Sequence, residues 1–257
     1  MRPNRVRQCW EWNRAASCLW IDVGWPLSAE ALAMLPFDAF VLDLQHSLID
    51  RSLVVPMLQA LSVGEAAPMV RVSRNDAAEI GFVLDAGAYG VICPQIDNAD
   101  DAARFVAACR YAPRGTRSWG PTRGQIYGGP DYFDAYEQTI LKIALVETVE
   151  GVENMEAIAS TAGIDMLYVG PNDLTIDYGG KPTYVAEDPR VISAMTNSIA
   201  IAKRHGIRSG TYAGNSEVAR AAFAKGYDLV SVGYAGKTMI KACQQLLDAA
   251  PGRIHQP

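Results

Sequence analysis

Short apolar runs alternate with amphipathic stretches along the chain. Runs of four to eight apolar residues without polar alternation are typical of strands buried on both faces, as in parallel sheets. Eight strand-like segments occur, most of them such runs: CLWID (18–22), AFVLDL (39–44), PMVRVS (68–73), YGVICPQ (89–95), KIALVET (142–148), DMLYVG (165–170), GIRSGTYAG (206–214) and DLVSVGY (228–234). The pattern predicts eight parallel strands, each followed by a helix.

Helix start and stop signals separate these runs. In NDAAEIGFVLDAG, Asn75 or Asp76 is a predicted N-cap and Gly87 a predicted helix end. Eight strand–helix units indicate one α/β domain over 1–257, a closed (β/α)8 TIM barrel, with residues 1–16 as a lead-in helix. An open doubly wound sheet is the alternative, but no GxGxxG opens the first helix.

The segment 112–130 interrupts this alternation. It is rich in Gly and Pro and contains Arg114, Arg117 and Arg123. Long irregular loops in compact domains are often functional. Because the segment lies between the fourth and fifth predicted strands, we expect a lid or acceptor-binding loop on the active face. A solvated surface loop is the alternative.

Composition narrows the class of protein. The chain is 49% hydrophobic with a net charge of −5, and its basic residues are scattered, which argues against a nucleic-acid partner. The five cysteines show no CxxC spacing, so we expect reduced thiols in the cytoplasm. No apolar run approaches the roughly 18 residues of a membrane span, and we expect no membrane partner.

Charged residues follow several of the apolar runs. They are Asp43 and His46 after the second, Arg71 in the third, Glu147 in the fifth and Asp173 after the sixth. A charge is costly inside a buried strand unless it reaches a polar cavity. Because the carboxyl ends of parallel barrel strands share one rim, we expect these side chains to converge there.

Glu147 and Asp173 together can hold a divalent cation such as Mg²⁺ or Mn²⁺, which commonly takes one or two protein carboxylates. Two carboxylates select weakly, so Co²⁺ and other divalent ions also fit. The alternatives are that Glu147 pairs with an arginine and that Asp173 caps the helix after it.

Arg71 and His46 complete the predicted chemistry. A guanidinium at the rim suits a carboxylate or an enolate oxygen, although a salt bridge with Glu147 is an equal alternative. His46 follows Asp43 by three residues, and an imidazole oriented by a carboxylate can act as a general acid or base. His46 as a third metal ligand is the rival interpretation.

Together these motifs resemble the HpcH/HpaI aldolase family of class II, metal-dependent pyruvate aldolases. The similarity covers nearly the whole chain. The motifs that carry it are LWIDVG, VLDLQHSLID, VRVSRND, DAGAYGVICPQIDNADDA, YAPRGTRSWGPTRG, VETVEG, YVGPNDL and SVGYA. The resemblance implies a phosphoenolpyruvate/pyruvate-type barrel and a homohexamer, a trimer of dimers with an exchanged C-terminal helix.

The resemblance also implies roles for individual residues. Glu147 and Asp173 would bind the metal, Arg71 would stabilise a pyruvate enolate, and His46 would transfer protons, oriented by Asp43. Further implied contacts are the Gly170, Pro171 and Asn172 backbone on the substrate carboxylate and Asp85 in a neighbouring subunit's site. We also expect Trp20, Gln45, Tyr212 and Arg123 to bind substrate. Gln45, Tyr212 and Leu145 depart from the pattern of some branches, which leaves the aldehyde and the stereochemistry open.

The predicted function is reversible, metal-dependent aldol cleavage of a 4-hydroxy-2-oxo acid to pyruvate, or hydroxypyruvate, and an aldehyde. A Schiff base is disfavoured because Lys142 lies at the start of its strand, far from the rim. The alternatives are a Claisen-type acyl-CoA lyase of the citrate lyase β and malyl-CoA lyase kind, and a barrel that binds an oxo acid without turnover.

Overall fold

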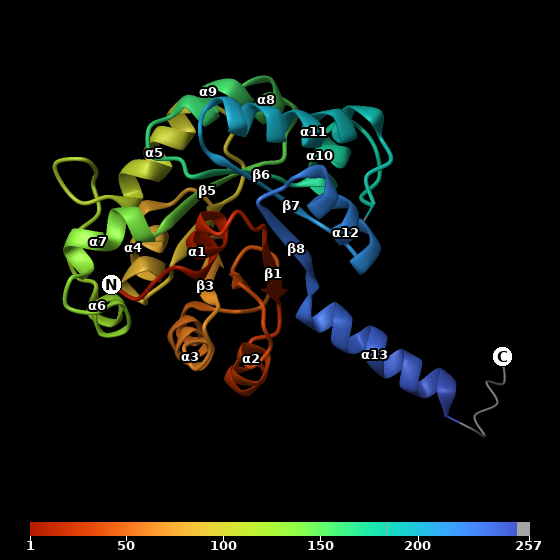
Figure 1. The fold of residues 1–257 in the computed structure, drawn as a ribbon, viewed down its shortest axis with the longest axis horizontal. Helices are drawn as coiled ribbons and strands as arrows, with labels where there is room; N and C mark the ends of the chain where they lie inside the picture. The colour runs from red at the N-terminus through yellow and green to blue at the C-terminus, as the bar shows by residue number, and fades with distance from the viewer. Residues whose placement is uncertain (184, 251–257) are drawn as a thin grey trace.

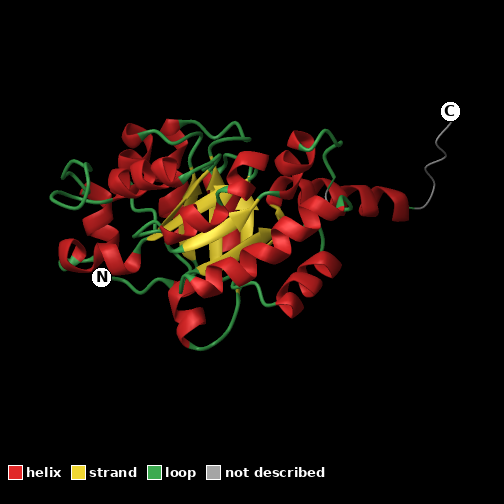
Figure 2. Ribbon diagram, turned by 90° about the horizontal axis from the view of Figure 1, so that it is seen from above, coloured by secondary structure: helices red, strands yellow, loops and turns green. Residues whose placement is uncertain are grey.

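The computed structural model describes residues 1–183 and 185–250; the last seven residues of the predicted domain, 251–257, lie outside this range. Eight parallel strands pair in chain order, and β8 pairs with β1 to close a barrel. Figure 2 shows the helices around it. The strands are β1 (Ala16–Ile21), β2 (Ala39–Asp43), β3 (Ala67–Arg71), β4 (Gly90–Cys93), β5 (Leu141–Val146), β6 (Met166–Val169), β7 (Arg208–Tyr212) and β8 (Leu229–Tyr234). The predicted TIM barrel is confirmed.

A helix follows every strand; the β5–β6 and β6–β7 connections contain two helices each, and the β4–β5 connection contains three. The helices are α1 (Arg5–Glu11), α2 (Pro26–Ala33), α3 (Arg51–Leu61), α4 (Ala77–Asp85), α5 (Ala99–Cys109), α6 (Thr122–Gly128), α7 (Tyr132–Thr139), α8 (Val149–Glu153), α9 (Met155–Ser160), α10 (Pro171–Asp177), α11 (Pro189–Arg204), α12 (Ser216–Lys225) and α13 (Ala235–Ala249). Asp76 caps α4 as predicted, accepting from the N–H groups of Ala78 and Glu79. The lead-in helix occupies only Arg5–Glu11.

Both faces of the strands are buried, which explains the unbroken apolar runs. On β2, Phe40 and Leu42 pack outward against the helices, whereas Ala39 and Val41 lie in the barrel interior. Alternation of this kind is the two-residue period of a strand. The interior of the barrel is therefore filled with side chains.

The segment 112–130, which was predicted to lie on the active face, lies instead at the end of the barrel where the strands begin. It contains α6, whose Arg123 donates to the carbonyl oxygens of Leu58 and Ala86 at the ends of α3 and α4. Helices of a barrel run antiparallel to its strands, so these helix ends lie beside the strand N-termini. The prediction of a loop on the active face was wrong because α5 has already returned the chain to the other end.

The last helix, α13, extends away from the barrel (Figure 1). Only Gly236 at its start is buried, while Met239, Ile240 and Leu246 are exposed along it. In the described part of the chain, no helix combines the length and apolar composition that crossing a bilayer would require.

Candidate active site at the C-terminal rim

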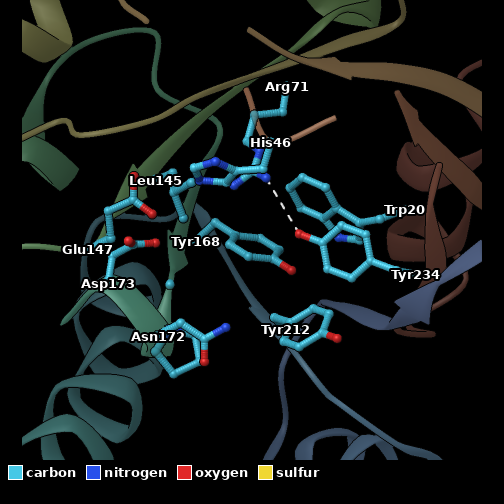
Figure 3. A pocket seen from close by; sticks show the side chains of 12 residues that line it. Trp20, His46, Arg71, Leu145, Glu147, Tyr168, Asn172, Asp173, Tyr212 and Tyr234 are labelled. Carbon is cyan, nitrogen blue, oxygen red and sulfur yellow. Dashed lines mark hydrogen bonds between the residues drawn. The ribbon is translucent and has the colours of Figure 1, made fainter. Parts of the chain in front are cut away.

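A cavity of about 80 Å³ lies at the carboxyl ends of the strands (Figure 3). This volume is well below the roughly 300–1,000 Å³ of pockets for drug-sized ligands, so it suits a small substrate. Its lining side chains come from most sides of the barrel. Those predicted from the sequence to serve the site are Trp20, His46, Arg71, Glu147, Gly170, Pro171, Asn172, Asp173 and Tyr212.

Arg71 is held by a buried carboxylate. Its Nε lies 2.9 Å and its Nη2 2.6 Å from the two carboxylate oxygens of Asp43, which is fully buried. The guanidinium also stacks over the Trp20 ring, 4.5 Å from the ring centroid. A two-point ion pair with an aromatic face behind it fixes the direction of the remaining N–H donors. Arg71 therefore presents an oriented cation to the cavity, and its ion pair is with Asp43 rather than Glu147.

Asp43 orients the loop after β2 through backbone N–H groups and not, as was predicted, through the His46 imidazole. Its Oδ1 accepts hydrogen bonds from the backbone N–H groups of Gln45, at 3.1 Å, and His46, at 3.2 Å. Within residues 1–183 and 185–250, no hydrogen bond joins Asp43 to the His46 imidazole. The predicted carboxylate–imidazole pair is therefore corrected: the carboxylate is occupied by Arg71, and the imidazole is an exposed group at the cavity.

Glu147 follows β5 and is buried, with 3% of its surface exposed. Its Oε1 accepts from the backbone N–H of Gln95, at 3.1 Å. Gln95 has a φ of +51°, a conformation uncommon for residues other than glycine. Burial, and then the negative charge of Asp173, raise the pKa of Glu147 to about 7, against the opposing effect of Arg71. The positive charge of Arg71 therefore only partly offsets the cost of ionising Glu147 in this buried site.

Asp173 lies in the first turn of α10 and is exposed to the cavity. It does not cap this helix, whose N-cap is Gly170. Figure 3 shows its carboxylate beside that of Glu147. A β carbon at Gly170 would lie only 2.9 Å from Glu147 Oε2, so glycine allows the close approach of the turn to the carboxylate.

The carboxylate pair fits a hard divalent cation, because two adjacent oxygen donors of like charge repel until a cation lies between them. Among the described residues, no group of three or more His, Cys, Asp and Glu side chains is arranged to hold a metal ion. This arrangement gives no support to His46 as a third ligand. Asn172 Oδ1, buried without a partner in the described structure, is a further acceptor beside the pair.

Besides Asp43, three predicted residues do not line the cavity. Gln45 does not line it, although its backbone is tied to Asp43. Asp85 ends α4 on the outside of the barrel, where its carboxylate pairs with Arg117 at 2.7 Å. Arg123 lies on α6 at the opposite end, where it donates to helix-end carbonyls, so the structure does not bring it to this cavity.

Sequence reasoning missed three residues at the site. Tyr168 on β6 and Tyr234 on β8 line the cavity, and buried Ser231 accepts a 2.6 Å hydrogen bond from Trp20 Nε1. The inward direction of Tyr168 could have been predicted, because the inward residue Met166 lies two positions earlier on the same strand. The inward direction of Tyr234 could not have been predicted, since strand alternation from the inward Ser231 would place Tyr234 on the outer face of the barrel.

Comparisons with known proteins point to one family. The family described as HpcH/HpaI aldolase/citrate lyase matches residues 16–242. A protein of Rhizorhabdus wittichii named hydroxypyruvate/pyruvate aldolase is 40% identical over 228 residues, covering 89% of this chain and 91% of its own. A 5-keto-4-deoxy-D-glucarate aldolase of Klebsiella pneumoniae is 35% identical over 96% of both chains.

A solved structure supports the same assignment. The crystal structure of an HpcH/HpaI aldolase/citrate lyase family protein from Burkholderia cenocepacia superposes with a TM-score of 0.88 and 31% identity, over 95% of this chain and 98% of that one. The family predicted from the sequence motifs is confirmed, and with it the prediction of an aldolase-type lyase. The chain belongs to the HpcH/HpaI aldolase/citrate lyase family.

Proposed function

We propose that this protein reversibly cleaves a 4-hydroxy-2-oxo acid to pyruvate, or hydroxypyruvate, and an aldehyde. The observation that carries the proposal is the meeting of the Glu147–Asp173 pair and the oriented Arg71 guanidinium in one small cavity. The two carboxylates suit a divalent metal ion, and Arg71 supplies a second positive charge beside it. Two adjacent positive charges suit the carboxylate and keto oxygens of a 2-oxo acid. The aldolases of R. wittichii and K. pneumoniae support the same reaction class.

Glu147 and Asp173 are the residues that would hold the divalent cation, with Mg²⁺ and Mn²⁺ as the first choices. When bound, such a cation supplies a Lewis acid for the 2-oxo group and its enolate. Gln95 fixes the direction of Glu147 through its backbone N–H. Close packing at Gly170 keeps the turn before α10 against the same carboxylate.

The other residues bind, orient and move protons. Arg71 faces the substrate oxygen that gains negative charge, and its ion pair with Asp43 keeps it from turning away. His46, which lines the cavity, would exchange the C3 and C4-hydroxyl protons with the substrate. The turn at Gly170, Pro171 and Asn172 would receive the substrate carboxylate, while Trp20 and Tyr212 form aromatic walls.

Assembly is part of the proposal. The exposed apolar side chains of α13 fit a helix exchanged between subunits of a hexamer, built as a trimer of dimers. Asp85 lies on the outside of its own barrel, as expected of a residue that serves a neighbouring subunit's site.

The reaction is tested by mixing pyruvate or hydroxypyruvate with a panel of short aldehydes and analysing products by mass spectrometry. We expect 4-hydroxy-2-oxo acids that form with Mg²⁺ or Mn²⁺ and not in EDTA. Cleavage of a 3-hydroxyacyl-CoA with no aldol product would favour the thioester lyase instead. That alternative loses its structural support here, because Arg114, Arg117 and Arg123 pair with Glu137, Asp85 and helix-end carbonyls.

A further inference from the structure

Tyr234, the last residue of β8, is turned into the cavity by an irregularity in the sheet. Cys18 of β1 pairs with Ser231, but Trp20 pairs with Tyr234, so β8 uses one residue more than β1 over this stretch. An extra residue of this kind is a β-bulge, and bulges re-aim side chains next to active sites. Without it, alternation from inward Ser231 would place Tyr234 on the outer face.

Gly233 permits the backbone conformation that the bulge needs. Its φ is +142°, a conformation that side chains other than glycine rarely adopt. A β carbon at this position would meet only Thr238 Oγ1, at 3.8 Å, so space is not what requires glycine. The backbone conformation itself is the reason, and its consequence is the inward Tyr234 ring.

The Tyr234 ring is fixed among the walls of the cavity. Its centroid lies 5.7 Å from that of Trp20 and 5.5 Å from that of Tyr212. Its hydroxyl oxygen lies 3.4 Å from Arg71 Nη2, and Figure 3 shows the phenol pointing toward Arg71. The hydroxyl is thus placed next to the cation that faces the substrate.

The direction of the hydrogen bond leaves the phenol hydrogen available. A guanidinium has only donors, so the Tyr234 oxygen must accept from Arg71. In the described residues, its hydroxyl has no other hydrogen-bond partner. Burial raises the pKa of Tyr234, with Arg71 opposing the shift, so the group is a protonated donor at neutral pH.

We propose that Tyr234 is a further catalytic residue, whose O–H donates a hydrogen bond to the substrate oxygen that Arg71 faces. This inference rests on the proposed function, in which that oxygen becomes negatively charged as the enolate forms. The tyrosine O–H bond is not broken. The C3–H electron pair moves into the enolate, the proton goes to the general base, and Tyr234 and Arg71 stabilise the charge.

A donor aimed at developing charge affects turnover more than substrate binding, because its hydrogen bond is stronger to the enolate than to the ketone. Tyr234→Phe removes the donor and keeps the ring. We expect metal-dependent hydrogen–deuterium exchange of the pyruvate methyl group to slow about 10- to 100-fold, with KM within about threefold of wild type.

A binding measurement gives a second readout. Oxalate is a planar dianion that resembles an enolate of pyruvate. Calorimetric titration with Mg²⁺ present should show oxalate binding weakened about tenfold in Tyr234→Phe, and pyruvate binding weakened much less. Gly233→Ala should reproduce both effects with the hydroxyl still present, because it disturbs the bulge.

The matched control is Tyr227→Phe, which removes a buried hydroxyl that donates to the Met195 carbonyl. It should lower the melting temperature and leave exchange and oxalate binding unchanged. Wild-type exchange and oxalate affinity in Tyr234→Phe would overturn the inference; if that variant does not fold, Gly233→Ala decides by the same two readouts. Absence of exchange in the wild-type enzyme would instead contradict the proposed function.

Discussion

Glu147 is an acid whose ionised form is disfavoured by its surroundings, since burial and Asp173 raise its pKa to about 7. In the unfolded chain a glutamate has a pKa of about 4.5. Between these values the folded metal-free protein binds more protons than the unfolded chain. The contribution of Glu147 to the free energy of unfolding is therefore fully present below about pH 4.5 and is lost as pH rises toward 7.

The first prediction is that metal binding is coupled to this proton. Below pH 7 a cation must displace a proton from Glu147, so its apparent affinity should fall up to about tenfold per pH unit as pH decreases. Titration with Mn²⁺ at several pH values measures this slope. Glu147→Gln should bind Mn²⁺ weakly and lose the slope between pH 5.5 and 7; an unchanged slope in that variant would show that another group binds the proton.

The Asp43 carboxylate is expected to stabilise the folded protein through its ion pair with Arg71. Asp43→Asn leaves the Arg71 charge buried without its partner, which typically costs about 3–5 kcal/mol of stability. Urea denaturation at pH 7 measures the loss. Glu156→Gln, which removes the exposed carboxylate that pairs with Arg204 and His205, is the matched control and should have little effect. Equal losses in the two variants would contradict a buried, paired Arg71.

At the scale of single elements, α6 is expected to be structural. Arg123→Met removes hydrogen bonds to the ends of α3 and α4, so we predict a loss of about 1–3 kcal/mol with kcat/KM unchanged. Denaturation and steady-state kinetics on the same preparation give both numbers. A fall in kcat/KM at wild-type stability would instead restore Arg123 to the substrate site.

The elements also show what the sequence can and cannot predict. Strand-like segments located all eight strands, because most positions of the strands are buried, and strand-end charges located Arg71 and Glu147. Arg123 was misplaced because a Gly- and Pro-rich stretch gives no sign of the end of the barrel at which it lies. Tyr234 was missed because a bulge breaks the two-residue period, and only Gly233 in the sequence hints at it.

At the scale of the whole molecule, α13 is the element with the least support from its own barrel. Its apolar side chains Met239, Ile240 and Leu246 are exposed, which is unfavourable for a helix that stays in water. We predict a hexamer by sedimentation equilibrium and smaller species for a chain ending at Tyr234. A monomeric full-length protein would contradict the exchanged helix.

We propose that Glu147, Asp173 and Arg71 together generate an enolate from a 2-oxo acid. Proton NMR of hydrogen–deuterium exchange at the pyruvate methyl group, and at C3 of hydroxypyruvate, tests it without knowledge of the aldehyde. We predict exchange that needs Mg²⁺ or Mn²⁺, stops in EDTA and is lost in Glu147→Gln. No exchange with either donor, in protein that binds the metal, would contradict the claim.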